Sequence, residues 1–217
     1  MASIEFIVKQ LLIFPYNGNA IEALDCIDSE FEFIGFIDDS IDKQTRQENG
    51  HSVFGRTILD KYEDAFLLIV PGSPTTFLER KRIIDNFTIR PERMAQIIHP
   101  KACISPLARI GKNVLIMAGV IITSNAIIGD HVCILPNTVI HHDVRINDYS
   151  LIGSNITIAG YATIGINCYI GSGTSIINDV AIGDRAMIGM GSNVIRNIDP
   201  DCIAVGNPCS IVACRQK

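Results

Sequence analysis

Two histidines and an aspartate stand side by side in the segment VIHHDVRIND, residues 139–148. The chain has only five histidines among its 217 residues, so the pair His141 and His142 concentrates titratable side chains at one point. An imidazole with a pKa of about 6.5 can accept a proton at neutral pH. A carboxylate beside it, here Asp143, stabilises the imidazolium and makes the ring more basic. The segment therefore contains a candidate general base, and the alternative on these residues alone is a surface histidine without a catalytic role, so the elements around it decide.

Isoleucine recurs every six residues through this region, from Ile98 to Ile188, and Val194 completes seventeen positions with no insertion. The residues four places after these isoleucines are mostly small or β-branched. A period of six fits neither an amphipathic helix nor a simple hairpin sheet, but it suits short strands joined by tight corners in a repeating coil. Each buried isoleucine contributes about 1.5–3 kcal/mol, so such coils can be stable without helices.

The corners repeat every 18 residues, so each coil has three sides. One corner carries residues that adopt positive φ readily, namely Gly111, Gly129, Asn147, Gly165 and Gly183. The corner that contains His141 has no glycine, and the next column places His142 between Ser124 and Gly160 of the neighbouring coils. This pattern predicts a left-handed parallel β-helix of hexapeptide repeats. A β-sandwich whose strands fall into register by chance is a poor alternative.

The first half of the chain alternates strands, turns and helices. Apolar runs begin the segments 11–27, 31–40 and 64–87, and the first and third segments continue through a turn into a helix. In the third segment we expect Ser73 to be the helix N-cap and Pro74 the first helical residue. This order predicts a small parallel α/β sheet of Rossmann-like type, with ligands at the carboxyl ends of its strands.

Three strand ends would form one crevice. They are Tyr16 to Asn19, Asp38 with Asp39, and Gly72 with Ser73. The turn PYNGNA lacks the G-x-G-x-x-G spacing, so a dinucleotide site has little support. The plainer alternative is that Asn17 and Gly18 only make a tight turn and that the aspartates only solvate a strand end.

Composition narrows the class of protein. The net charge is −5, and residues 1–97 hold 16 acidic against 10 basic side chains, which argues against nucleic acid as the main partner. No apolar run reaches the roughly 18–20 residues of a spanning helix, and no signal peptide is recognisable. The seven cysteines are an odd number without a C-x-x-C pair, so neither a disulfide framework nor a zinc site is indicated, and we expect a cytoplasmic protein.

An α/β domain followed by an uninterrupted hexapeptide β-helix resembles the nucleotide-sugar acetyltransferases. The nearest types are UDP-4-amino-sugar N-acetyltransferases of bacillosamine-type pathways, with perosamine N-acetyltransferases and sialic acid O-acetyltransferases as relatives. The resemblance covers nearly the whole chain. It implies a nucleotide-sugar-binding domain at 1–94, an acetyltransferase β-helix at 95–205 and a C-terminal tail at 206–217. It also implies a homotrimer that uses acetyl-CoA as co-substrate, held in grooves between neighbouring β-helices.

The resemblance also assigns residues. The base motif of the family, a histidine followed by an acid, falls on His142 and Asp143. The family's sugar-nucleotide contacts fall on Asn17, Gly18, Asn19, Asp38, Asp39 and Gly72. Its acetyl-CoA contacts fall on Leu151, Ser172 and Met190. The chain departs from the family where it has Asn19 in a turn that is usually glycine-rich with a histidine, and where Leu151 replaces a frequent histidine.

Aminolysis of a thioester needs a neutral amine, a base for its proton and donors for the developing oxyanion. We therefore expect His142 to be the base and Asp143 its partner. Gly160 is the expected oxyanion donor through its backbone N–H, because the missing side chain lets the thioester approach. His141 is expected to position substrate rather than to take the proton. The expected substrate is a nucleotide-linked amino sugar, such as a UDP-4-amino-4,6-dideoxy sugar.

Three other functions stay open on the sequence. The same base would serve O-acetylation of a sugar hydroxyl. A β-helix that binds a nucleotide without turnover would keep the isoleucine ladder but would gain nothing from a His-Asp pair. A carbonic anhydrase of the same fold would need three imidazoles around zinc. Only His131, His141 and His142 lie well inside the coils, and two of them are adjacent, so we expect no metal site.

Overall fold

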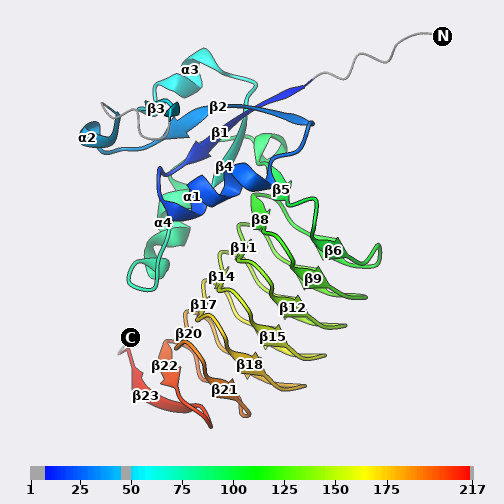
Figure 1. Cartoon of the computed structure of the whole chain (residues 1–217). Coiled ribbons are helices and arrows are strands. Elements are labelled where there is room, and N and C mark those ends of the chain that lie inside the picture. Colours follow the sequence, from blue (N-terminus) through cyan, green and yellow to red (C-terminus); the bar gives the residue numbers. More distant parts are fainter. Residues whose placement is uncertain (1–7, 45–49, 216–217) are drawn as a thin grey trace, which may run out of the picture.

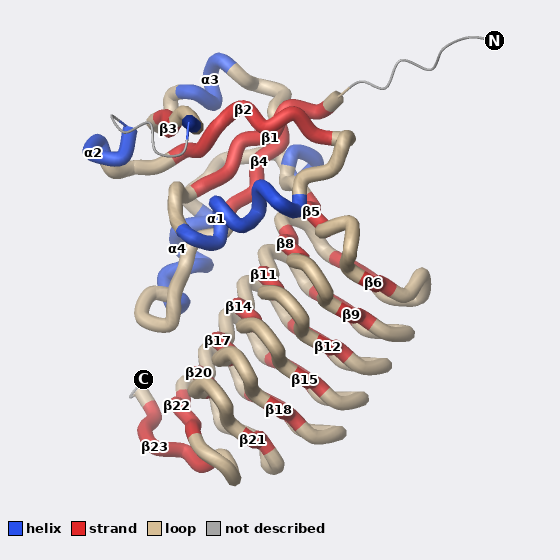
Figure 2. Tube along the Cα trace, in the orientation of Figure 1, coloured by secondary structure: helices blue, strands red, loops and turns tan. Residues whose placement is uncertain are grey.

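The structure is a computed structural model that describes residues 8–44 and 50–215. They form an α/β domain seated on one flank of a parallel β-helix (Figure 1). The architecture expected from the sequence is thus confirmed. In the described residues, helices occur only in the N-terminal domain, and the coils of the β-helix consist of short strands and turns (Figure 2).

The N-terminal sheet has four parallel strands in the order β3-β2-β1-β4. Its strands are β1 Lys9–Phe14, β2 Phe31–Ile37, β3 Val53–Phe54 and β4 Phe66–Ile69. Apolar side chains cover both faces of the central strand, where Leu11, Leu12 and Ile13 are fully buried. A strand buried on both faces is typical of a parallel sheet, and it explains why this run reads as continuously apolar.

The helices of this domain are short. They are α1 Gly18–Glu22, η1 Ala23–Cys26, α2 Ile41–Gln44, α3 Ile58–Lys61, η3 Phe77–Glu79, α4 Arg80–Asp85 and η4 Pro91–Arg93. None of the helices in the described part has the length and hydrophobicity that crossing a membrane requires. The expected helix start at Ser73 and Pro74 is wrong. The Ser73 hydroxyl bonds to the hydroxyls of Thr75 and Thr76, at 3.0 and 2.9 Å, which closes a turn before η3 instead of capping a helix.

The β-helix is built from three sheets, one for each side of the coil, and their strands are parallel except for the last strand of the chain. The six-stranded sheet contains β6 Cys103–Ile104, β9 Ile121–Ile122, β12 Val139–Ile140, β15 Thr157–Ile158, β18 Ser175–Ile176 and β21 Asn193–Val194. The five-stranded sheet contains β7 Arg109–Ile110, β10 Ile127–Ile128, β13 Arg145–Ile146, β16 Thr163–Ile164 and β19 Ala181–Ile182. The eight-stranded sheet contains β5 Gln96–Ile98, β8 Val114–Ile116, β11 Cys133–Ile134, β14 Leu151–Ile152, β17 Tyr169–Ile170, β20 Met187–Ile188, β22 Cys202–Val205 and β23 Ser210–Cys214.

The isoleucine ladder forms the interior of the β-helix. Strands pair one coil apart, so that Ile134 lies opposite Ile152 and Ile140 opposite Ile158. These four side chains are fully buried and belong to one apolar cluster that runs through the coils. The period of 18 residues in the sequence is therefore the length of one coil.

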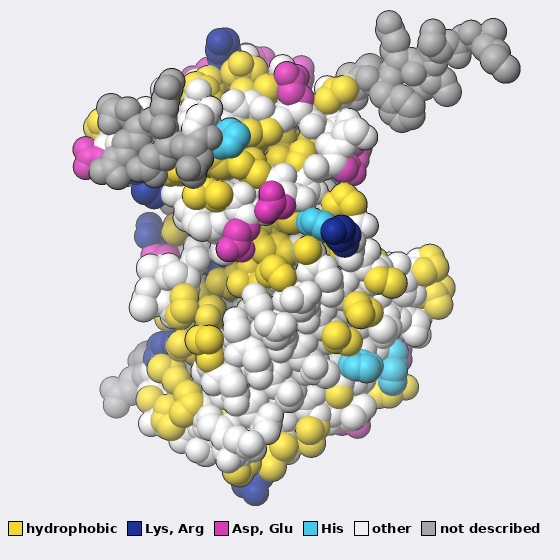
Figure 3. Space-filling view, viewed as in Figure 1, with side chains coloured by type: hydrophobic (Ala, Val, Ile, Leu, Met, Phe, Trp, Pro, Cys, Tyr) yellow, Lys and Arg dark blue, Asp and Glu magenta, His cyan; other side chains and the backbone are white. Residues whose placement is uncertain are grey.

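The N-terminal domain rests on the outer face of the eight-stranded sheet. Leu115, Cys133, Leu151 and Tyr169 point out of this sheet and join the apolar cluster that holds Leu11 and Phe36 of the domain. Figure 3 shows hydrophobic side chains gathered along this junction. The two parts of the chain thus share a core, which fixes the strand ends of the domain against the side of the coils.

The C-terminal segment ends in a hairpin. Strand β23 pairs antiparallel with β22, which sets Cys202 opposite Cys214, and a disulfide joins them. No pattern in the sequence indicates this bridge, because the two cysteines lie outside the hexapeptide register and become neighbours only through the hairpin. The expected cytoplasmic location stays a prediction.

Candidate active site

His142 and Asp143 lie at the turn after β12, on the edge of the β-helix that faces away from the N-terminal domain (Figure 1). Asp143 has a left-handed backbone, with φ +61°, and its N–H donates to the Ser124 carbonyl at 3.0 Å. This conformation turns its carboxylate back towards the preceding residue. Oδ2 of Asp143 lies 3.0 Å from Nδ1 of His142. When Nδ1 carries the proton, Nε2 keeps the lone pair that a general base needs.

Two further contacts fix this pair. The Asn125 amide, one coil away, donates to Oδ1 of Asp143 at 3.2 Å. On the other side, the His142 ring lies against the backbone of Gly160. A Cβ on Gly160 would come within 2.6 Å of Cε1 and 2.8 Å of Nε2 of this ring. The imidazole is therefore held by a carboxylate at one nitrogen and by a bare backbone at its face, while 46% of the side chain stays exposed.

Gly160 was expected to be the oxyanion donor, and its contact with His142 gives it a second role. Among the described residues, no hydrogen bond from the Gly160 N–H is found, whereas its carbonyl accepts from Asp179 at 3.2 Å. Gly160 is itself buried, its oxyanion role stays a prediction, and its missing side chain is what makes room for the ring. His141 is partly exposed beside this pair, and its backbone N–H donates to Ile158 in the coil. Its ring makes no hydrogen bond within the described part of the chain.

A cavity of about 600 Å³ lies between the strand ends of the N-terminal domain and the eight-stranded sheet. Five residues that the sequence predicts to contact the sugar nucleotide or acetyl-CoA line it, namely Asn17, Gly18, Asn19, Gly72 and Leu151. Leu135 and Tyr169 complete the apolar wall, and Glu79 and Arg82 are its charged side chains. The convergence of strand ends that the sequence predicts at residues 16–19 and 72–73 thus forms a real concavity.

Asn17 shapes this cavity through its own hydrogen bonds. It is the N-cap of α1, since its side-chain oxygen accepts from the Ala20 N–H at 2.9 Å. Its amide also donates to the carbonyl of Val70, at the end of β4, at 3.3 Å. The side chain therefore ties the first strand end to the third. The neighbouring Gly18 has open space where a side chain would stand.

Gly72 is required by a buried arginine that sequence reasoning missed. Gly72 has φ +113°, and a Cβ there would lie 2.8 Å from Cγ of Arg80. Arg80 is fully buried and donates to the carbonyls of Tyr149 at 2.9 Å, of His131 at 2.8 Å, and of Pro71. Burial lowers the pKa of this guanidinium to about 10. Arg80 thus joins the cavity loop to two coils of the β-helix.

Asp38 and Asp39 follow β2 but do not line this cavity. The Asp38 carboxylate is buried and accepts from the Tyr16 N–H at 3.1 Å and from Lys43 at 2.8 Å. Asp39 forms a two-point contact with Arg56, at 2.7 and 2.8 Å. In this structure both carboxylates are occupied by protein groups, and the expectation that they contact substrate stays a prediction.

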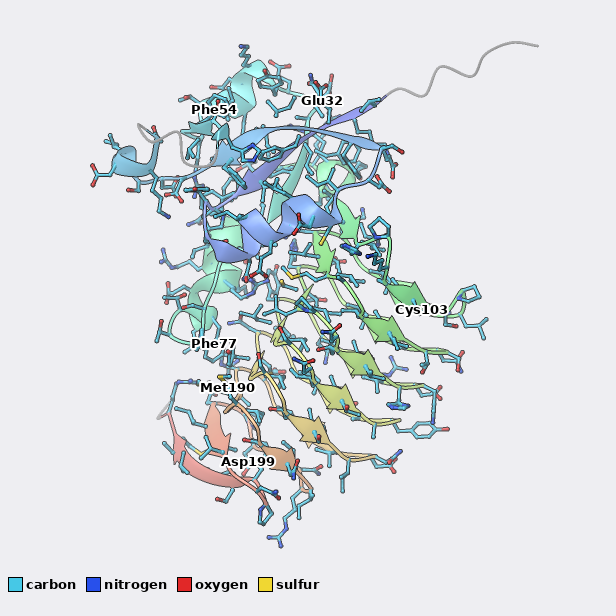
Figure 4. All side chains as sticks on the ribbon, viewed as in Figure 1. Glu32, Phe54, Phe77, Cys103, Met190 and Asp199 are labelled. Carbon is cyan, nitrogen blue, oxygen red and sulfur yellow. A yellow bond between two sulfur atoms is a disulfide. The ribbon has the colours of Figure 1, made fainter. Side chains whose placement is uncertain are left out.

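The three residues expected at acetyl-CoA lie on neighbouring coils and differ in exposure, and their role stays a prediction. Leu151 is only 3% exposed, under the N-terminal domain. Ser172 and Met190 lie one coil apart at the corner between the eight-stranded and six-stranded sheets, where the Ser172 hydroxyl accepts from the Ser154 N–H at 3.0 Å. Met190 is 72% exposed, and Figure 4 shows it below Phe77 of the N-terminal domain. This corner borders the cavity through Leu135, whereas His142 belongs to the next corner.

Comparison with known proteins agrees with the fold of the chain. The family described as bacterial transferase hexapeptide (six repeats) matches residues 107–142 and 125–160, the coils that carry His142. No curated protein matches the sequence. Perosamine N-acetyltransferase from Caulobacter crescentus, solved with CoA and GDP-perosamine, is 26% identical over 95% of this chain and 98% of its own, with a TM-score of 0.80.

The chain is therefore similar, in its repeats and in its whole fold, to hexapeptide-repeat acetyltransferases. A variant of the Caulobacter enzyme in which one histidine is asparagine aligns equally well, at 27% identity, the same coverage and a TM-score of 0.81. The acetyltransferase domain of PglB from Neisseria gonorrhoeae FA1090, solved with acetyl coenzyme A, is 21% identical over 94% of this chain and 99% of its own. Its TM-score of 0.81 shows that the two chains share a fold.

One pattern in the sequence, the regular spacing of asparagine and aspartate, could have predicted more of the residues around the site. In most of the coils, one position in every six has positive φ, and Asn125 and Asp143 occupy successive such positions of one column, 18 residues apart. Asn113 occupies another of these positions and exchanges two hydrogen bonds with the backbone of Ile69 in the N-terminal domain. Asparagine at regular spacing therefore marks side chains that hold neighbouring coils and domains, in addition to marking turns. Within the described residues, no group of three His, Cys, Asp or Glu could hold a metal ion.

Proposed function

We propose that this protein moves the acetyl group of acetyl-CoA onto the amino group of a nucleotide-linked amino sugar, with His142 as general base. The observation that carries the proposal is the contact of Nδ1 of His142 with Asp143, which leaves Nε2 over the bare backbone of Gly160. Support for the substrate class comes from the Caulobacter enzyme, which shares the fold and was solved with CoA and GDP-perosamine.

The proposed chemistry uses few groups. The neutral amine attacks the thioester carbonyl, and Nε2 of His142 takes the amine proton as the carbon–nitrogen bond forms. Asp143 stabilises the imidazolium, and the Gly160 N–H donates to the oxyanion of the tetrahedral intermediate. The intermediate then collapses, the carbon–sulfur bond breaks, and the imidazolium returns its proton to the departing CoA thiolate. His142 acts at both steps, and each group ends in its starting state.

The nucleotide sugar is proposed to occupy the cavity of the N-terminal domain. Its volume of about 600 Å³ falls within the range of small-molecule sites. Arg82 lines it with a side chain that is 70% exposed, and its guanidinium can pair with a diphosphate although Glu79 contacts it at 2.7 Å. UDP, GDP and dTDP all carry that diphosphate, so the base is left to experiment.

The base and the cavity lie on different corners of one β-helix. Leu135, which lines the cavity, and His141 are six residues apart, and one extended side of the coil spans up to about 20 Å. We therefore propose a homotrimer in which the His142 corner of one copy closes the cavity of the next. Ser172 and Met190 lie on the same corner as Leu135, which lines the cavity, and there the groove between copies would hold acetyl-CoA.

Mixed trimers test this arrangement. Gly18→Phe should fill the cavity, since the space at Gly18 is open, and His142→Ala should remove the base. Each variant alone should be inactive. Trimers assembled from equal amounts of both should regain about one quarter of wild-type activity, because one site in four would combine an intact cavity with an intact base. Mixtures that stay inactive while forming trimers would contradict the shared site.

The substrate class is tested by thiol release from acetyl-CoA with UDP-, GDP- and dTDP-linked amino sugars. We expect release with at least one of them, and none with its counterpart that carries a hydroxyl in place of the amine. Release only with hydroxyl sugars would establish O-acetylation instead. Binding of a nucleotide sugar without any thiol release would leave the non-catalytic alternative in place and overturn the proposed reaction.

A further inference from the structure

The turns of the β-helix repeatedly use a left-handed backbone. Positive φ occurs at Asn113, Gly119, Asn125, His131, Asn137, Asp143, Tyr149, Asn155, Tyr161, Asn167, Gly173, Asp179, Arg185 and Gly191. Most of these residues are Asn, Asp or Gly, the types that tolerate this conformation at little cost. Larger side chains are unfavourable there, so each of the four exceptions requires a contact that explains it.

Three of the exceptions have such contacts away from the proposed base. His131 and Tyr149 stack on each other at 4.6 Å between ring centroids, in the column that faces the N-terminal domain. Tyr149 also donates through its hydroxyl to Asp85 of that domain at 2.8 Å. Arg185 forms two hydrogen bonds with Asp201, at 2.7 and 2.6 Å. These residues hold the N-terminal domain and the end of the chain against the coils.

Tyr161 is the fourth exception, and its contact is with His142. The two ring centroids are 5.1 Å apart at an interplanar angle of 82°, an edge-to-face arrangement. The Tyr161 N–H also donates to the His142 carbonyl at 3.2 Å. The side chain is 58% exposed, and its hydroxyl has no hydrogen-bond partner within the described residues. Neither packing in the core nor a tie between domains explains a tyrosine at this left-handed position.

The surroundings of His142 show what Tyr161 adds. Asp143 fixes one nitrogen of the ring, and Gly160 leaves space at one face. Because the side chain is half exposed, these two contacts leave a path by which the ring can swing into solvent. Tyr161 stands on the coil next to it and covers a further side of the imidazole. Asn125, Asp143 and Tyr161 are successive members of one column of left-handed positions.

We propose that Tyr161 is a positioning residue for His142, whose aromatic ring keeps Nε2 directed at the thioester. This inference rests on the proposed function, since it assigns Tyr161 to the same site. An edge-to-face contact of ordinary strength corresponds to about 2- to 12-fold in rate when it acts in the transition state. The ring carries this role, and the hydroxyl does not.

Two substitutions at one position test the proposal. Tyr161→Phe keeps the ring, and its kcat should stay within about 2-fold of wild type. Tyr161→Asn keeps the left-handed preference but removes the ring, so kcat should fall by about 2- to 12-fold with KM for acetyl-CoA nearly unchanged. Tyr149→Asn is the matched control at the domain junction. It should lower thermal stability, whereas Tyr161→Asn should leave stability near that of wild type.

A crystal structure of each variant gives a readout that needs no turnover. The His142 ring should keep its place in Tyr161→Phe and should be displaced or spread over several rotamers in Tyr161→Asn. An unmoved ring with unchanged kcat in Tyr161→Asn would overturn the proposal, as would an equal loss in Tyr161→Phe. If no amino-sugar nucleotide supports thiol release by the wild type, the proposed function fails, and the ring positions alone decide the role of Tyr161.

Discussion

His142 and Asp143 are neighbours in the chain, and their side chains meet with Nδ1 3.0 Å from Oδ2. Successive residues of an extended strand point to opposite faces, so this contact depends on the left-handed backbone of Asp143, with φ +61°. Aspartate and asparagine are among the few residues that tolerate this conformation and also carry an oxygen for the imidazole. The turn of the β-helix thus supplies the partner of the base from within the repeat itself.

Asp143→Asn keeps the backbone and a hydrogen-bond acceptor but removes the charge. We expect kcat to fall roughly 10-fold, because the imidazolium loses its counter-charge while the ring stays in place. Steady-state kinetics at saturating acetyl-CoA measure this. A loss as large as that of His142→Ala would mean that the carboxylate is essential to the base, for example by fixing its tautomer, and does not only stabilise the imidazolium.

Gly160→Ala tests the bare backbone under the ring. The added Cβ would lie 2.6 Å from Cε1 of His142, and the half-exposed ring can move aside into solvent. We therefore expect a melting temperature close to that of wild type and a kcat lower by about 10²-fold, the usual cost of a misplaced catalytic group. A fully active Gly160→Ala enzyme would contradict the requirement for a bare backbone under the ring, although the N–H of residue 160 is kept in this variant.

Ile152→Ala tests the isoleucine ladder. Ile152 is fully buried in the core of the coils, so the substitution should cost about 2–5 kcal/mol of unfolding free energy through lost transfer energy and a cavity. Leu107→Ala is the control, because Leu107 is 62% exposed and should cost less than about 0.5 kcal/mol. Urea denaturation of both variants compares them directly.

His131 should make stability depend on pH. Burial is the largest cause that lowers its pKa below the ordinary 6.5, and Arg80 acts in the same direction. The groups that oppose this shift are Asp130, Asp148 and Asp85. The unfolded chain then binds more protons than the folded one just below pH 6.5, so stability is complete above that value and is lost as the pH falls.

Denaturation midpoints measured from about pH 7.5 down to about pH 5, the span around an ordinary histidine pKa, test this effect. His131→Asn keeps a residue that accepts the left-handed backbone, with φ +62°. It should be less stable at neutral pH, through loss of the stacking on Tyr149, but its stability should vary less over this range. An unchanged pH slope in the variant would assign the effect to other groups.

The sequence predicts most of the scaffold, because burial imposes a strict period on it. An isoleucine in every sixth position leaves little choice but a coil, and the strand ends at Asn17 and Gly72 follow from ordinary turn chemistry. The burial of Arg80 was not predicted, because nothing in its local sequence distinguishes it from the exposed Lys81 and Arg82. Its burial depends on carbonyls of His131 and Tyr149, about 50 and 70 residues away in the chain.

Other parts of the site could not be predicted for related reasons. Asp38 looks like an exposed strand-end carboxylate, but Tyr16 and Lys43 turn it inward. Tyr161 looks like an ordinary surface residue until its left-handed backbone is known. The pairing of the six-residue period with positive φ is a property of three-dimensional turns, and the sequence alone shows it only where glycine or asparagine is present.

The central claim is that His142 takes the proton of the amine, and kcat of His142→Ala tests it most directly. The account predicts that kcat falls by roughly 10² to 10⁴-fold, the usual contribution of a positioned base. Calorimetry should show that the variant still binds acetyl-CoA. His141→Ala, the control on the neighbouring residue, should act mainly on KM. A His142→Ala enzyme that keeps nearly full kcat, or a His141→Ala enzyme that alone loses it, would contradict the assignment.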